Sequence, residues 1–310
     1  MSTILITGGT GLVGKRLTHH LIAEGHNVII LTRKIPNTTP TQGIQYALWN
    51  VAEQTIDEIA VQKAQYIIHL AGAGVVDKFW TDAYKNEIVQ SRTQSSALLI
   101  KALEKQHHQL KAVISASAIG WYGADPRHIE NGWKGFAENT LPDEGFLGNT
   151  CKKWEDSIEP VTKWGIRLAK LRIGIVLSND GGALAEFKKP LKFGVAGIIG
   201  SGQQMVSWVH IDDLCKLFLH AIENELIQGS YNAVAPEPVS NKTLTLTLAK
   251  AMKGKWFIPL HVPPFALKIL MGESSIEVLK STTVSSRKVE QTGFTFQYPT
   301  ISSAIEQLIQ

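Results

Sequence analysis

The 310-residue sequence has only two cysteines, Cys151 and Cys215. They form no CxxC pair and no zinc-ligand spacing, which excludes a disulfide-stapled scaffold, indicates a reducing compartment and predicts no metal site. The N-terminus runs directly into STILITGG without a basic segment followed by an apolar one, so we expect no signal peptide. The apolar runs are too short to span a bilayer. We therefore expect a cytoplasmic protein without a membrane partner.

The sequence also lacks a large excess of charge of one sign. It has 31 Lys and Arg residues against 27 Asp and Glu residues, a formal net charge of +4. This balance predicts no broad basic field of the kind that attracts nucleic acids or anionic membranes. The expected partner is a small molecule, which the balance allows to be anionic.

What the sequence does contain is an alternation of apolar strands and helical segments. Strands are predicted at residues 4–7, 28–31, 66–70, 111–116 and 167–173. Helical periodicity covers residues 12–24, 80–105 and 146–164. Such alternation is typical of an α/β protein with a doubly wound parallel sheet covered by helices on both faces. We therefore predict a Rossmann fold.

The pattern changes after residue 177. An NDGG turn at 179–182, a glycine-rich stretch at 194–202 and prolines at 259, 263 and 264 interrupt the alternation. We predict that residues 1–176 and 207–234 form the dinucleotide-binding domain. Residues 177–206 and 235–310 are predicted to form a smaller, discontinuous C-terminal α/β domain that covers the open end of the sheet.

The first strand is followed by the glycine-rich motif GGTGLVG at 8–14, which opens the first helix. This is the context that a dinucleotide-binding turn requires: Gly8 permits the tight turn, Gly11 lets the backbone approach a pyrophosphate, and Gly14 lets helix and strand pack closely. The phosphates then meet free N–H groups at the helix N-terminus. The predicted cofactor-binding residues of this turn are Gly8, Thr10, Gly11, Leu12, Val13 and Gly14.

The residues after the second predicted strand indicate which nicotinamide cofactor binds. An acidic residue at this place would hold the ribose 2′-hydroxyl of NAD, but the sequence has Arg33 and Lys34 instead. Two cations suit a 2′-phosphate through charge-assisted hydrogen bonds. The prediction is NADP; the alternative is a pair of solvated surface cations.

Together with this turn, further motifs resemble those of the extended short-chain dehydrogenase/reductases: LAGA at 70–73, SAS at 115–117 and WVHIDD at 208–213. The sequence is most similar to an atypical branch usually labelled nucleoside-diphosphate-sugar epimerase. The motifs of that branch are SR at 91–92, RIGIVL at 172–177, GG at 181–182, GSGQQMVSWVH at 200–210, NAVAP at 232–236, PP at 263–264 and GFTFQYP at 293–299. The resemblance covers nearly the whole chain.

The resemblance implies an NADP-dependent epimerase or oxidoreductase whose small-molecule substrate is a sugar nucleotide or another polyhydroxylated or carbonyl compound. It leaves a homodimer open. It also implies a further set of residues facing the dinucleotide: Trp49, Leu70, Ala71, Gly72, Glu87, Arg92, Ser115 and Val176. For Glu87 and Arg92 the alternative is a solvated charge pair on one helix.

The usual chemistry of that superfamily needs a Tyr-x-x-x-Lys pair, and the sequence contains none. Aligned on Glu155, the two positions hold Leu147 and Cys151. The candidate replacements are Ser117 and Tyr122, which follow the same strand end; the alternatives are a capping hydroxyl and a packing aromatic ring. Because a positioned acid or base is worth about 10²–10⁴-fold in rate, a non-catalytic NADP(H)-sensing regulatory or scaffold protein is the second hypothesis.

Overall fold

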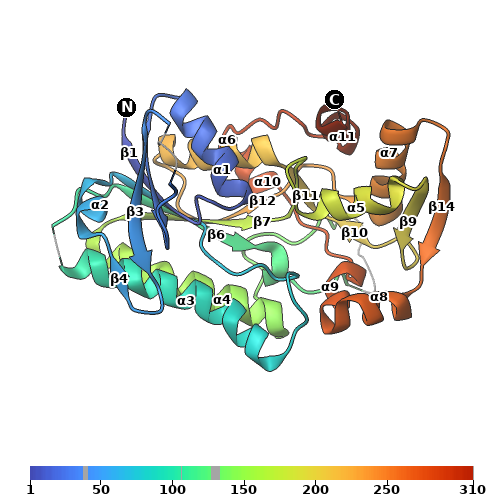
Figure 1. Ribbon diagram of the computed structural model, residues 1–310, viewed down its shortest axis with the longest axis horizontal. Coiled ribbons are helices and arrows are strands. Elements are labelled where there is room, and N and C mark those ends of the chain that lie inside the picture. Colours follow the sequence, from blue (N-terminus) through green and yellow to red (C-terminus); the bar gives the residue numbers. More distant parts are fainter. Residues whose placement is uncertain (38–40, 106, 127–132, 310) are drawn as a thin grey trace.

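The computed structural model describes residues 1–37, 41–105, 107–126 and 133–309, and Gln310, the end of the predicted second domain, lies outside them. The largest sheet in the described residues has eight strands in the order β12-β7-β6-β5-β1-β2-β3-β4 (Figure 1). All neighbouring strands in it are parallel except β3 and β4. The strands are β1 (Thr3–Thr7), β2 (Asn27–Thr32), β3 (Ile44–Asn50), β4 (Thr55–Ile56), β5 (Tyr66–His69), β6 (Ala112–Ala118), β7 (Arg167–Ile173) and β12 (Gly229–Ala233).

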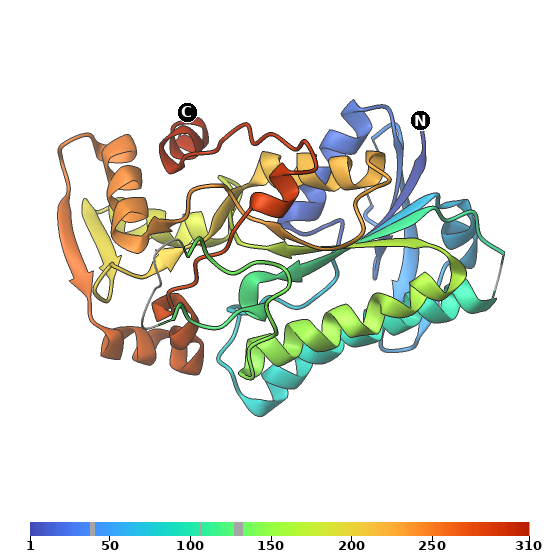
Figure 2. The same cartoon turned by 180° about the vertical axis from the view of Figure 1, so that it is seen from behind.

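Helices cover both faces of this sheet, as Figures 1 and 2 show from opposite sides. One face carries α1 (Leu12–Ala23), α6 (Ile211–Glu223) and α10 (Arg287–Glu290). The other carries α2 (Glu58–Lys63), α3 (Asp82–Lys105) and α4 (Phe146–Ile158). The strands are apolar on both sides because both sides are buried. The predicted α/β Rossmann fold with a doubly wound parallel sheet is confirmed.

The chain winds away from β1 in both directions. Residues 1–56 build the sheet outward through β2 and β3, and the chain then returns to the other side of β1 to build β5, β6 and β7. In such sheets ligands bind outside the carboxyl ends of the strands, where the direction of winding changes. That place is the gap between the strand ends of β1 and β5.

A second group of elements lies beyond the carboxyl ends of the strands (Figure 1). Its strands are β8 (Ile175–Leu177), β9 (Val195–Ile199), β10 (Met205–Val206), β11 (Trp208–His210), β13 (Val239–Ser240) and β14 (Ile258–Val262). Its helices are α5 (Ala183–Leu191), α7 (Asn241–Lys253), α8 (Pro264–Met271), α9 (Ser275–Leu279) and α11 (Ile301–Ile309), with the 3₁₀ helix η3 (Gly272–Ser274). They bury a hydrophobic cluster of their own around Leu184, Trp208 and Leu248.

The C-terminal segment does not follow the predicted division of the chain. Val289, Phe294 and Phe296, which we assigned to the smaller domain, pack in the same core cluster as Ile4 and Ile114 of the large sheet. The chain then returns to the smaller cluster at Tyr298 and through Ile301, Ala304, Ile305 and Leu308 of α11. Residues 287–296 therefore belong structurally with the larger unit.

Two local predictions differ from the structure. Strand β6 continues through Ser117 and ends at Ala118, so that Ser117 lies in the strand and the 3₁₀ helix η1 (Ile119–Trp121) follows. The predicted helix 146–164 is α-helical only to Ile158, and the 3₁₀ helix η2 (Glu159–Trp164), with Pro160 in its first turn, follows. Within the described ranges, every helix is too short or too polar to cross a bilayer.

Candidate functional site

The glycine turn between β1 and α1 is packed too tightly for side chains. Gly8 has a φ of +69°, and a Cβ atom there would lie 3.0 Å from the carbonyl carbon of Leu70. A Cβ atom on Gly14 would overlap the carbonyl oxygen of Gly8. These two glycines let the turn lie against the end of β5 and against its own helix.

The turn leaves the N-terminus of α1 open. Gly11 is the N-cap residue and no side chain caps the first N–H groups; the Gly11 N–H itself bonds the Gly8 carbonyl oxygen at 3.0 Å. Helix N-terminal N–H groups and the helix dipole favour an anion. Thr10 and Gly11 are exposed, while Leu12 and Val13 are half-buried. The turn fits a pyrophosphate.

A buried hydrogen-bond chain fixes the adjacent end of β5. The Thr7 hydroxyl accepts hydrogen bonds from the N–H groups of Leu70 and Ala71, each at 3.1 Å. Its own hydrogen is then directed to Nδ1 of His69, 2.8 Å away, and Nε2 of His69 lies 3.1 Å from the Ser96 hydroxyl. Burial lowers the pKa of His69 to about 4, so the ring is neutral. The sequence analysis missed this chain; the signal was one histidine ending the apolar run YIIHL.

Two cations follow β2, beside the glycine turn in the sheet. Arg33 and Lys34 are exposed, and neither forms an ion pair with a carboxylate of the described residues. The Thr32 hydroxyl donates to the Lys34 carbonyl oxygen at 2.9 Å, which closes the turn after the strand. Both cations are therefore available to an anionic ligand.

Arg92 is a nearly buried cation of α3 with 8% exposure. Its guanidinium stacks over Trp154 at 4.8 Å and donates to the Ile88 carbonyl oxygen at 2.8 Å. A Cβ atom on Gly72 would lie 3.1 Å from the guanidinium carbon. Burial lowers the pKa of Arg92, and no carboxylate of the described residues compensates its charge by an ion pair. Gly72 and Arg92, two of the predicted cofactor-binding residues, thus lie together beyond the end of β5.

The other predicted cofactor residues fall into two groups. Val176 packs on the core of the larger unit, and a Cβ atom on Gly182 would lie 3.1 Å from Leu12 and 3.9 Å from the Val176 carbonyl oxygen, so Leu12 and Val176 lie near one another. The remaining three residues, Glu87, Trp49 and Ser115, make contacts with other parts of the chain. Glu87 is exposed and pairs with Lys78 at 3.1 Å, Trp49 is buried in the core with Ala47, and the Ser115 hydroxyl bonds the adjacent Ala116 carbonyl.

This architecture has relatives along the full length of the chain. An epimerase family protein of Staphylococcus aureus (strain NCTC 8325 / PS 47) is 34% identical over 312 residues, which cover 100% of both chains. The chain belongs to the epimerase family. Residues 4–140 of this epimerase family protein match the NAD dependent epimerase/dehydratase family, and residues 262–308 match a domain of unknown function, DUF1731.

Two solved structures agree with this assignment. The human epimerase family protein SDR39U1 (isoform 2) with NADPH is 27% identical, with a TM-score of 0.84 over 99% of both chains. The nucleoside-diphosphate sugar epimerase from Corynebacterium glutamicum is 31% identical, with a TM-score of 0.77 over 99% of this chain and 58% of that one. The chain is an atypical short-chain dehydrogenase/reductase with the NAD(P)-binding fold.

The two positions that usually carry the tyrosine and lysine in this superfamily are apolar here. Leu147 packs against the cluster of Trp80 and Ile88. Cys151 is 4% exposed, and burial raises the pKa of its thiol to about 12. Neither side chain supplies or accepts a proton near neutral pH, since a reactive cysteine needs exposure and a lowered pKa.

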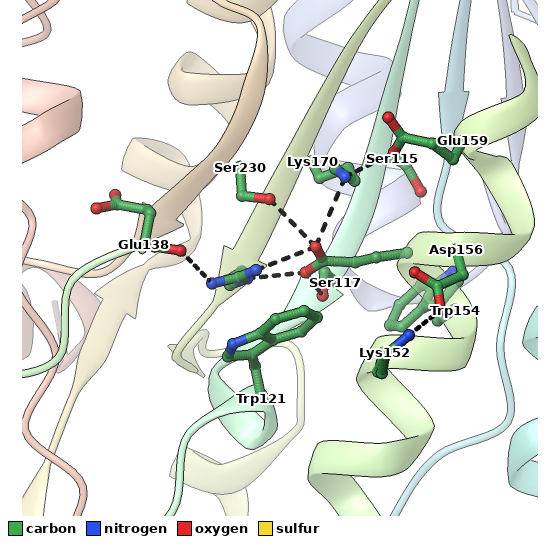
Figure 3. Close-up of polar contacts among 12 residues, drawn as sticks. Ser115, Ser117, Trp121, Glu138, Lys152, Trp154, Asp156, Glu159, Lys170 and Ser230 are labelled. Carbon is green, nitrogen blue, oxygen red and sulfur yellow. Dashed lines mark hydrogen bonds and ion pairs between the residues drawn. The ribbon is translucent and has the colours of Figure 1, made fainter. Parts of the chain in front are cut away.

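Ser117 is held by a buried ion pair. The Glu155 carboxylate binds Arg172 through two hydrogen bonds of 2.8 and 3.1 Å, and the Ser117 hydroxyl donates to the same carboxylate at 2.8 Å. Ser230 donates to it at 3.1 Å, and Lys170 lies 3.8 Å away (Figure 3). The Ser117 hydroxyl is thus used inside the structure.

Tyr122 belongs to the same network. Its side chain is fully buried, its hydroxyl donates to Asn232 at 2.7 Å and it accepts from Arg172 at 3.0 Å. The Arg172 guanidinium lies 3.7 Å from the centre of the Trp121 ring (Figure 3). Burial raises the pKa of Tyr122 to about 12. The catalytic role of Ser117 and Tyr122 stays a prediction; in the structure both hydroxyls are buried and hydrogen-bonded to other side chains.

The WVHIDD motif joins distant parts of the chain instead of forming a metal site. His210 caps α6 by accepting from the Asp212 N–H at 3.1 Å. Although burial alone would raise the pKa of Asp212, hydrogen bonds from His20 and Arg16 of α1 lower it. Asp213 accepts from two backbone N–H groups, at residues 297 and 298. Across the described ranges, no group of three or more His, Cys, Asp or Glu side chains is placed to hold a metal ion.

Proposed function

We propose that this epimerase family protein binds NADP(H) in preference to NAD(H) and acts as an epimerase or oxidoreductase on a small polyhydroxylated or carbonyl substrate such as a sugar nucleotide. The observation that carries the proposal is the pair of free cations, Arg33 and Lys34, at the end of β2 beside the glycine turn. The human relative, whose structure contains NADPH, supports it.

Each group of residues around the glycine turn has a role in this proposal. The N–H groups that open α1 hold the pyrophosphate, and Arg33 and Lys34 hold the 2′-phosphate. Arg92, against Gly72, supplies a further positive charge to the dinucleotide. The bound cofactor supplies the hydride chemistry. The Thr7, His69 and Ser96 chain keeps the end of β5 fixed, so that the cofactor meets a rigid surface.

The proton of the reaction has no side-chain carrier at the usual place. Leu147 and Cys151 cannot transfer it, and Ser117 and Tyr122 are engaged with Glu155, Asn232 and Arg172. In the proposed reaction, water or the substrate itself exchanges the proton. Turnover is then expected to be slower than with a positioned acid, by about 10²–10⁴-fold.

The same observation favours a second candidate function, an NADP(H)-sensing protein without turnover. The two candidates differ in two measurements: the absorbance of NADPH in the presence of quinones and aldehydes, and the stereochemistry of sugar nucleotides recovered after incubation with the protein and cofactor. A substrate-dependent change in absorbance supports an oxidoreductase. Formation of an epimer at constant absorbance supports an epimerase, because an epimerase returns the hydride to its product. Constant absorbance without an epimer supports the sensor.

Substitution of Arg33 by glutamate tests the cofactor preference. Replacing a cation by an anion beside the 2′-phosphate should weaken NADPH binding by about 10–100-fold and leave NADH binding nearly unchanged. The Kd values follow from isothermal titration calorimetry. Arg287→Glu is the matched control, since Arg287 is also exposed but lies at the start of α10. Equal effects of the two substitutions would refute the role of Arg33.

A further inference from the structure

The smaller unit exposes two large aromatic side chains at one tip. Phe193 follows α5 and Trp256 follows α7, and each is 87% exposed. The two turns lie side by side, because the Ile258 N–H donates to the Gly194 carbonyl oxygen at 2.8 Å where β14 pairs with β9. Exposed apolar groups that cluster in this way usually mark an interaction surface.

The exposed apolar surface continues along β14 and α8. Ile258 and Leu260 are 71% and 57% exposed, and on α8 only Leu267 is buried. In Figure 1, β14 follows the right-hand edge of the molecule down to α8, and Figure 2 shows the same edge at the left. The apolar edge consists of Phe193, Trp256, Ile258, Leu260, Phe265, Ile269 and Leu270.

The two chain segments that form the apolar edge carry charge of one sign. Residues 187–206 contain three lysines and residues 238–272 contain five, and neither range contains an aspartate or glutamate. Lys192, Lys250, Lys255 and Lys268 are exposed and form no ion pair with the described carboxylates. Since the whole chain carries only +4, the rest of the molecule is net negative. The positive charge is concentrated where the apolar side chains are exposed.

We propose that the apolar edge binds the surface of an anionic lipid bilayer. Aromatic and aliphatic side chains enter the boundary between headgroups and acyl chains, and the lysines meet the anionic headgroups. A nucleic acid fits less well, because four of the seven side chains of the edge are isoleucine or leucine, which offer no stacking surface to bases. A second copy fits less well too, because it would bring two lysine-rich edges together, and Pro259 removes an N–H group from β14.

The test is co-sedimentation of the full chain with vesicles of phosphatidylcholine alone or mixed with phosphatidylglycerol. The chain should sediment with the mixed vesicles, dissociate from them at high salt, and not sediment with vesicles of phosphatidylcholine alone. Two double variants, Phe193→Ser/Trp256→Ser and Lys192→Glu/Lys255→Glu, should each weaken binding by at least about tenfold.

The matched control is Leu141→Ser/Leu226→Ser, which removes two side chains that are 82% and 88% exposed outside the apolar edge. It should bind like the unmodified chain, and all variants should keep its unfolding temperature. No binding to anionic vesicles would overturn the proposal, as would equal binding by Phe193→Ser/Trp256→Ser. A dimer in light scattering that this variant abolishes, without vesicle binding, would assign the edge to a second copy and also overturn it.

Discussion

At the scale of single residues, the buried pair of Glu155 and Arg172 organises the carboxyl ends of β6, β7 and β12. Arg172 comes from β7, Glu155 from α4, and Ser117 and Ser230 from the two neighbouring strands. Although burial alone would lower the pKa of Arg172, its hydrogen bonds with Glu155 raise it. Arg172 therefore stays charged, and it depends on the Glu155 carboxylate for two of its hydrogen bonds.

Replacing one partner of this pair should reduce the free energy of unfolding more than replacing both partners. Glu155→Leu leaves the buried Arg172 without a carboxylate partner, and Arg172→Leu leaves Glu155 with only the more distant Lys170 as a cation. Glu155→Leu should reduce the free energy of unfolding by about 3–5 kcal/mol, and Arg172→Leu by a similar or smaller amount. The double variant Glu155→Leu/Arg172→Leu should lose less than either single variant. Urea unfolding of the three proteins measures this, and simple additivity of the two single effects would contradict the coupling.

His69 makes the stability depend on pH. Its pKa is about 4 in the folded chain and about 6.5 when unfolded, so the unfolded state binds the proton first as pH falls. Stability is complete above about pH 6.5 and should fall by about 3 kcal/mol towards pH 4 through this group. His69→Asn keeps an acceptor for Thr7 and cannot be protonated. In urea unfolding between pH 7 and pH 4, the free energy of unfolding of this variant should fall less steeply than that of the unmodified chain. An unchanged slope would contradict the assignment.

The residue scale also shows where sequence reasoning stops. The glycine turn and Arg33 with Lys34 could be predicted because their function depends on local backbone and charge. The engagement of Ser117 and Tyr122 could not, because their partners Glu155 and Asn232 are 38 and 110 residues away in sequence. A hydroxyl at a strand end predicts a position, whereas its hydrogen bonds depend on the tertiary structure.

At the scale of elements, the contact between β1, its glycine turn and α1 decides whether a dinucleotide can bind. The turn packs against the end of β5 at Gly8 and against its own helix at Gly14. The strand and helix were predictable from their apolar periodicity. Strand β3 was not delimited, because QYALWN shows mixed burial in the structure and no clear alternation in sequence.

Gly14→Ala tests this contact. The added methyl group would overlap the backbone at Gly8 and Gly9 and displace α1 from the turn. NADPH affinity should fall by at least about tenfold, with a loss of about 1–3 kcal/mol in the free energy of unfolding. Gly197→Ala is the control, since its Cβ atom would make only ordinary contacts at 3.6 Å and beyond. Equal NADPH affinities of the two variants would contradict the account.

At the scale of the whole molecule, the C-terminal segment fastens the two units to each other. It leaves the smaller unit after α9, packs Phe294 and Phe296 on the larger core, and returns as α11. Between these parts, the Asp213 carboxylate accepts the N–H groups of Gln297 and Tyr298 at 2.8 and 2.9 Å. Sequence composition showed a second unit after residue 177 but could not show this return, which depends on contacts across 80 residues and more.

Asp213→Ala removes both acceptors at once. The N–H groups of Gln297 and Tyr298 lose their acceptor, and each should lower the free energy of unfolding by about 1–3 kcal/mol where it stays buried. Hydrogen exchange should accelerate at residues 297–309 more than in β1 or β5. Asp156→Ala, which breaks only a surface pair with Lys152, is the control. A uniform acceleration of hydrogen exchange over the whole chain would contradict a local role of Asp213 in holding the C-terminal segment.

Charge and association are also whole-molecule properties. The net charge of +4 led us to expect no membrane partner, because a sum over the chain hides the lysine-rich edge of the smaller unit.

The homodimer stays a prediction. Of the described residues in α3 and α4, no large hydrophobic side chain is exposed, so the outer face of this helix pair offers little apolar surface to a second copy.

The central claim is that the residues around the glycine turn bind the dinucleotide that carries a 2′-phosphate. Calorimetric titration of the unmodified chain with NADPH and with NADH, at one salt concentration, tests it most directly. The structure predicts binding of both, with a Kd for NADPH at least about tenfold lower. Equal Kd values would contradict the role of Arg33 and Lys34. Failure of both NADPH and NADH to bind would contradict a dinucleotide-binding site at the glycine turn.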